Sequence, residues 1–192
     1  MNQAVVIRRI TKNAIMLALM CAVGMFAIPL GDNIKVSLQL LMVFIIGLTA
    51  TSVFDALIVT SLYLALGLFM PIYAGFHVGI TPTFGFVISF VVISIPLYFL
   101  NNLKIKNQFI RMGLACFVSL IICYAIGSMF MMLYLKISIE KALLIAVVPY
   151  LVFDIAKIIM LSSGYFSYRL RGSGSSSSPP YSSSSRRRQN PS

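Results

Sequence analysis

Asp154 and Lys157 are the residues whose types and spacing most clearly suggest chemistry, because both lie inside an apolar run, residues 142–163. Residues three positions apart on an α-helix share one face, so a carboxylate and an ammonium group would lie side by side. A charge near the middle of a bilayer costs about 2.5–3.5 kcal/mol on insertion scales, and something must compensate for it. Two interpretations are open at this point. The pair either only stabilises helix packing or belongs to a ligand site, which is the default hypothesis for ionisable residues within a membrane.

The composition of the chain indicates an integral membrane protein. Of its 192 residues, 59% are hydrophobic and 10% are charged, which is too apolar for a soluble domain. The formal charge of +11 does not indicate nucleic-acid binding, because most of the charges flank apolar runs and three form the terminal Arg186-Arg187-Arg188. Membrane topology explains these charges better.

Six apolar runs organise the chain, since a membrane-spanning helix needs about 20 apolar residues. We expect an all-α membrane domain over residues 1–171 and a disordered Ser/Pro/Arg tail over residues 172–192. The connection at residues 71–82 is rich in glycine, proline and aromatic residues, which predicts a structured lid; His77 within it has no predicted role. The predicted spans are residues 13–30, 38–54, 56–70, 83–100, 112–135 and 142–163.

The distribution of basic residues predicts the orientation of these six spans. Both termini then lie on one side of the membrane, and the side richer in Lys and Arg is the cytoplasmic one. The outer side carries Lys35, Lys136 and Lys141, and it also carries the connections at residues 31–37 and 71–82. We therefore expect a cell-membrane protein with both termini in the cytoplasm. The basic residues on that inner side are Arg8, Arg9, Lys12, Lys104, Lys106, Arg111, Arg169 and Arg171.

The motifs of common enzymes are absent from the sequence. There is no Gly-x-x-x-x-Gly-Lys-Ser/Thr phosphate loop, no His-Glu-x-x-His and no Gly-x-Ser-x-Gly. Four acidic residues and one histidine leave few general acid–base pairs, and the three cysteines match no metal spacing. The sequence therefore predicts neither an enzyme nor a bound metal or cofactor.

Ala14, Ala18 and Ala22 recur every four residues in the first span. Small side chains on one helix face let another helix approach closely. The spacing alone fits two arrangements equally: a docking surface for another membrane protein, or packing within this chain.

Four patches of the sequence resemble, in order and spacing, the signatures of the BioY family, the biotin-capturing S components of energy-coupling-factor (ECF) transporters. The resemblance extends over most of the chain before the tail. The patches are Ile34-Lys-Val-Ser-Leu-Gln39, Ser61-Leu-Tyr-Leu-Ala-Leu-Gly-Leu-Phe-Met-Pro-Ile-Tyr-Ala-Gly75, Thr81-Pro-Thr-Phe-Gly-Phe86 and Pro149-Tyr-Leu-Val-Phe-Asp-Ile-Ala-Lys157.

The resemblance implies a six-helix S-component fold that captures biotin from outside. It implies docking onto a transmembrane coupling subunit that is joined to two cytoplasmic ATPases, with the stripe of Ala14, Ala18 and Ala22 as the docking face. Other readings are an S component for another vitamin, a lone facilitator, or a scaffold subunit without a transport role. The expected substrate-binding residues are Gln39, Tyr73, Phe76, Thr83, Tyr150, Asp154 and Lys157.

Overall fold

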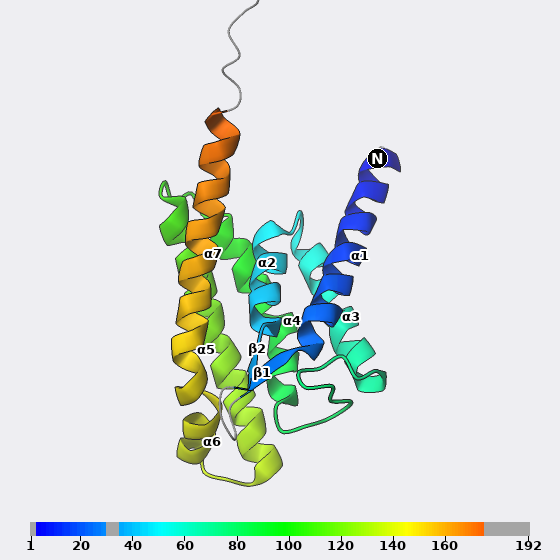
Figure 1. Cartoon of the computed structure of the whole chain (residues 1–192), viewed down its shortest axis with the longest axis vertical. Helices are drawn as coiled ribbons and strands as arrows, with labels where there is room; N and C mark the ends of the chain where they lie inside the picture. The colour runs from blue at the N-terminus through cyan, green and yellow to red at the C-terminus, as the bar shows by residue number, and fades with distance from the viewer. Residues whose placement is uncertain (1–2, 30–34, 175–192) are drawn as a thin grey trace, which may run out of the picture.

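The computed structural model describes residues 3–29 and 35–174, and this part of the chain forms seven helices and one short β-hairpin (Figure 1). The two strands pair antiparallel, with Ile28 opposite Val36. The predicted helical fold is confirmed, and the short hairpin is an addition that the sequence did not predict. The elements in chain order are α1 (Gln3–Met25), β1 (Ala27–Pro29), β2 (Lys35–Ser37), α2 (Gln39–Thr49), α3 (Val53–Phe69), α4 (Phe84–Asn101), α5 (Gln108–Leu135), α6 (Ile139–Ala146) and α7 (Val148–Gly174).

The last predicted span, residues 142–163, is two helices rather than one. Helix α6 ends at Ala146 and α7 begins at Val148, and the pair is bent by 47° at this break. Pro149 explains the position of the break. Proline has no N–H and its ring clashes with the preceding turn, so it fits best in the first turn of a helix, although α4 also accommodates Pro96 in its interior.

Several other predicted boundaries differ from the structure; helix α7, for example, continues to Gly174, beyond the predicted start of the tail at residue 172. Helix α1 begins at Gln3, ten residues before the predicted start of the span at residue 13, so Arg8, Arg9 and Lys12 lie on the helix instead of preceding it. Helix α2 has 11 residues and ends at Thr49 instead of residue 54. Ser52 then caps α3, and its side chain accepts a hydrogen bond from the Phe54 amide.

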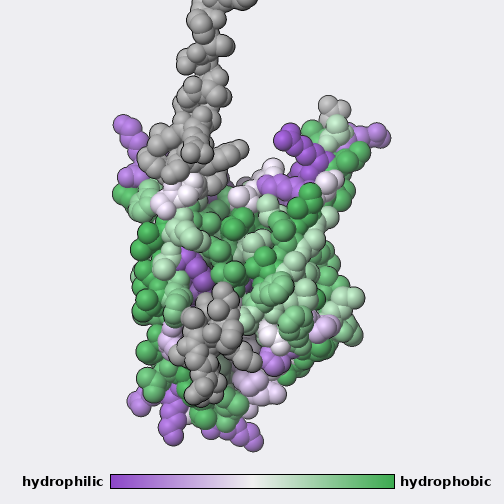
Figure 2. Space-filling view, viewed as in Figure 1, coloured by the Kyte–Doolittle hydropathy of each residue, from purple (hydrophilic) through white to green (hydrophobic). Residues whose placement is uncertain are grey.

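Two of the described helices, α4 and α5, are long and apolar enough to cross a membrane, and the bent pair α6–α7 counts as a third. Helices α2 and α3 are apolar but shorter. Large apolar side chains such as Leu62, Val92 and Ile121 point outward. Figure 2 shows the result as a broad hydrophobic band with hydrophilic groups at both ends. Such a band is the surface that lipid chains cover, and the chain is an integral membrane protein.

Helices α4 and α5 approach closely through two reciprocal contacts. The Phe130 side chain of α5 packs on Gly85 of α4, and the Phe86 side chain of α4 packs on Gly127 of α5. A Cβ atom at either glycine would overlap the facing ring, so small residues set the helix spacing here. This packing also fixes Phe86, which lines the cavity described below.

The connection between α3 and α4 is a hydrogen-bonded structure anchored by Tyr73. The Tyr73 ring is buried against Gly67, and its hydroxyl donates to the Leu64 carbonyl at 2.7 Å. Gly75 and Gly79 have φ angles of +78° and +74°, which glycine adopts without strain. The Gly75 amide donates to the Met25 carbonyl at 3.2 Å, so this connection is tied to the end of α1.

Candidate ligand-binding site

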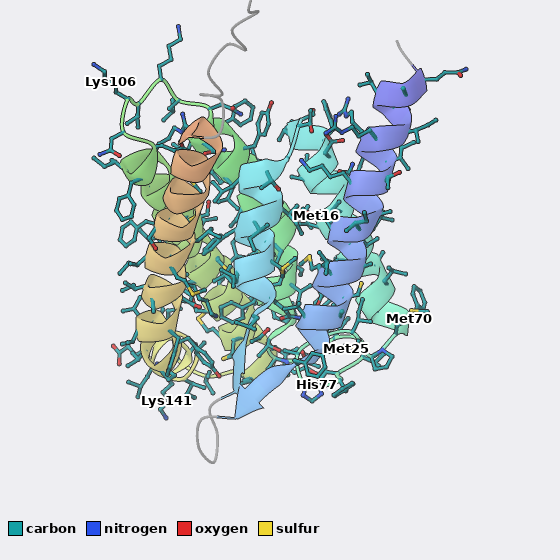
Figure 3. All side chains as sticks on the ribbon, turned by 45° about the horizontal axis from the view of Figure 1, so that its top comes forward. Met16, Met25, Met70, His77, Lys106 and Lys141 are labelled. Atoms are coloured by element: carbon teal, nitrogen blue, oxygen red, sulfur yellow. The ribbon has the colours of Figure 1, made fainter. Side chains whose placement is uncertain are left out.

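One cavity of about 360 Å³ lies near the end of the molecule that carries the hairpin and the α3–α4 connection. In Figure 3, His77 lies at this end with Met25 and Met70, and Lys106 lies at the other. The volume is within the range typical of small-molecule sites. The cavity is lined by Ser37, Gln39, Leu40, Tyr73, Ala74, His77, Thr81, Thr83, Phe86, Val87, Phe90, Cys123, Tyr124, Met131, Ile145, Ala146, Tyr150, Asp154 and Lys157.

A buried polar cluster forms one wall of this cavity. The Lys157 ammonium donates to Asp154 Oδ1 at 2.8 Å and to the Ser37 carbonyl oxygen at 2.8 Å. The Tyr124 hydroxyl donates to Asp154 Oδ2 at 2.6 Å. Asp154 and Lys157 are 5% and 8% exposed, so the two charges compensate each other where water does not reach them freely.

The cluster can donate hydrogen bonds to a ligand and can also accept hydrogen bonds from it. An ammonium group has three donors, and Lys157 uses two of them within the chain. A carboxylate has about four acceptor sites, and Asp154 uses two. Because the pair is neutral overall, the arrangement suits a neutral polar group that carries donors and an acceptor together.

A second part of the cavity wall is aromatic, and Gln39 helps to position it. The Gln39 side-chain amide donates to the Tyr63 hydroxyl, and that hydroxyl donates to the Ile72 carbonyl at 2.9 Å. The Tyr63 and Tyr73 rings meet edge to face with centroids 5.8 Å apart. These contacts join the start of α2, the middle of α3 and the α3–α4 connection into one wall.

Six of the seven residues expected to bind substrate line this cavity: Gln39, Tyr73, Thr83, Tyr150, Asp154 and Lys157. Phe76 is not among the lining residues; its side chain is 62% exposed and its φ is +61°.

Sequence reasoning overlooked Tyr124, the aromatic side chains of α4 and the Ser37 carbonyl, and it assigned no role to His77. Within α5, Tyr124 follows Cys123 and lies between Ser119 and Ser128. Hydroxyl-bearing side chains within an apolar span were the available signal.

The stripe of Ala14, Ala18 and Ala22 is exposed, so it is not buried against the described part of the chain. The face of α1 that packs against the chain carries Arg9 and Asn13, which contact α3. Among the described residues, no group of three or more His, Cys, Asp or Glu side chains could hold a metal ion.

The fold and the cavity define a helical membrane protein with a small-molecule-sized cavity whose walls are partly polar and partly apolar. The BioY family model matches residues 1–170, and the chain belongs to the BioY family. The structure is similar to the crystal structure of the S component for biotin from an ECF-type ABC transporter, with a TM-score of 0.73 over 90% of this chain and 95% of that chain. The sequence identity is 22%, so this likeness establishes the S-component fold. No match was found among curated proteins.

Proposed function

We propose that this chain binds biotin and serves as the substrate-binding subunit of an ECF-type transporter. The observation that carries the proposal is the neutral cluster of Asp154, Lys157 and Tyr124 in the wall of a cavity with apolar sides. The ureido ring of biotin has two N–H donors and one carbonyl acceptor, which Asp154 and Lys157 complement respectively. Membership of the BioY family and the S-component fold support the same ligand.

The charges of the site give biotin one orientation in this proposal. A second carboxylate beside Asp154 would leave a buried net negative charge, which is costly. The ureido ring therefore faces Asp154 and Lys157, and the bicyclic ring and valeryl chain lie along Phe86, Val87 and Phe90. The carboxylate tail points toward the exposed rim at His77 and Thr83.

The chain crosses the membrane six times in this proposal, with α6 and α7 forming one broken span. The end that carries the start of α1 and the α4–α5 connection is cytoplasmic, because these segments contain more Lys and Arg than those at the opposite end. The cavity then lies toward the outside, where biotin arrives.

The partners in the proposal are a transmembrane coupling subunit and two cytoplasmic ATPases. The sequence carries no phosphate loop, so ATP hydrolysis belongs to other chains. The exposed stripe of Ala14, Ala18 and Ala22 on α1 is the proposed docking face for the coupling subunit.

Binding of radiolabelled biotin to the purified chain tests the proposal. We expect saturable binding, with affinity lowered at least about tenfold in Asp154→Asn, because a hydrogen bond to a charged group is worth about 1.5–3 kcal/mol. Lys141→Gln is the matched control, since Lys141 is exposed and outside the cavity. Displacement of the label by another vitamin and not by biotin would reassign the substrate, and unchanged affinity in Asp154→Asn would remove Asp154 from the site.

A further inference from the structure

Asp154 is held by donors from two different helices. Lys157 reaches Oδ1 from the next turn of α7, and the Tyr124 hydroxyl reaches Oδ2 from α5. Tyr124 is itself buried, with 9% of its surface exposed. The two contacts act on different oxygens, so they restrain the orientation of the carboxylate as well as its position.

Lys157 alone would not restrain the carboxylate in this way. One contact to one oxygen leaves the carboxylate free to turn about its own axis, and a group that turns loses part of its hydrogen-bond energy when a ligand must order it. A second contact to the other oxygen removes that freedom before the ligand arrives. Each oxygen keeps acceptor capacity for the ligand.

We infer that Tyr124 is a positioning residue that fixes Asp154 as a paired acceptor and thereby selects ligands with N–H donors. The inference rests on the proposed function, in which the ureido N–H groups face Asp154. In this role the hydroxyl of Tyr124 acts through Asp154, although its ring also lines the cavity.

The experiment compares two ligands in each purified variant. One is biotin, and the other is a biotin analogue methylated on both ureido nitrogens, which has no N–H donors. The variants are Tyr124→Phe, which removes only the hydroxyl, and Tyr124→Leu, which removes both the hydroxyl and the aromatic ring. Tyr98→Phe is the control, because Tyr98 is an α4 residue outside the cavity lining.

In both Tyr124 variants we expect biotin affinity to fall about tenfold, as for loss of a hydrogen bond to a charged group. Affinity for the methylated analogue should change less than about twofold in Tyr124→Phe, which keeps the ring, since that ligand makes no use of a fixed acceptor. The ratio of the two affinities is taken within one variant, so a reduced folded fraction does not alter it. An equal fall for both ligands, or no fall for either, would overturn the inference.

A double-mutant cycle then separates indirect from direct action. If Tyr124 acts through the charge of Asp154, Tyr124→Phe should cost less than about threefold in the Asp154→Asn background, because a neutral hydrogen bond is worth less than one to a charged group. Additive effects would mean that Tyr124 contacts the ligand independently, which contradicts the positioning role. Wild-type chain that binds no biotin would instead refute the proposed function, a result distinct from each of these.

Discussion

Arg9 of α1 and Asp55 of α3 form an ion pair with an Nη2–Oδ2 distance of 2.8 Å, and neither residue lines the cavity. Asn13 donates to the other oxygen of Asp55 at 3.0 Å. The Arg9 side chain is 36% exposed and that of Asp55 is 10% exposed, so Asp55 depends on these partners more than Arg9 does.

Arg9→Ala should therefore destabilise the protein, and Arg8→Ala should not. Removing Arg9 leaves a mostly buried carboxylate without its countercharge, at a cost of about 1–3 kcal/mol in the free energy of unfolding. Arg8 is exposed and has no ion pair in the described part of the chain. Unfolding followed in detergent gives both values, and equal stability of the two variants would show that the pair contributes nothing measurable.

Gly67→Ala should weaken both folding and ligand binding, because the Tyr73 ring occupies the space that the new methyl group needs. Overpacking of this kind costs about 1–3 kcal/mol, and displacement of Tyr73 alters the cavity wall. Gly164→Ala is the control, since a Cβ atom there meets nothing within 4 Å. Binding and thermal unfolding are measured on both variants. If Gly67→Ala binds biotin as the wild type does, Tyr73 does not shape the site.

Biotin should protect the α3–α4 connection from hydrogen exchange. His77, Thr81 and Thr83 of this segment line the cavity, so a bound ligand should lower the frequency of local opening. Exchange is followed by mass spectrometry with and without biotin. The α4–α5 connection, residues 102–107, lies at the other end and serves as the internal control. Protection that is equal in both segments would contradict a ligand-dependent lid.

Ala18→Trp should separate binding from transport. A bulky side chain on the exposed face of α1 prevents close approach of a coupling helix, and this face does not contribute to the cavity. We expect biotin binding within about twofold of wild type and loss of uptake in cells that express the coupling subunit and its ATPases. Val92→Trp, also exposed but on α4, should leave both unchanged.

Either half of the Ala18→Trp experiment can contradict the docking proposal. Loss of biotin binding in the isolated chain would show that the alanine stripe supports internal packing. Persistent uptake would place the docking face elsewhere.

The sequence was most informative where a free-energy cost and the residues that offset it lie close together in the chain. Two charges three residues apart in an apolar run require compensation within one helix turn, so Asp154 and Lys157 could be paired from the sequence alone. Tyr124 lies 30 residues earlier, on another helix, and only the packing of α5 against α7 brings the two together. The Ser37 carbonyl was not predictable at all, because a main-chain acceptor has no signature in the residue type.

The predicted boundaries of the spans were inaccurate for a related reason. Hydrophobicity marks membrane segments well but does not reveal where a helix stops, so the break at Val147 was overlooked although Pro149 is visible in the sequence. The hairpin also escaped prediction, since pairing of Ala27–Pro29 with Lys35–Ser37 depends on how the ends of α1 and α2 are placed.

The contact from Lys157 to Ser37 uses a carbonyl oxygen of the main chain, and this makes it invisible to ordinary side-chain mutagenesis. Replacement of Ser37 by any other residue keeps this acceptor, so a scan of single substitutions would report only the loss of the Ser37 hydroxyl, which accepts a hydrogen bond from the Gln39 amide at 3.0 Å. Sequence drift at position 37 is correspondingly unconstrained by Lys157. Only a change to the backbone itself, such as an ester in place of the amide between residues 37 and 38, weakens the acceptor and exposes its contribution.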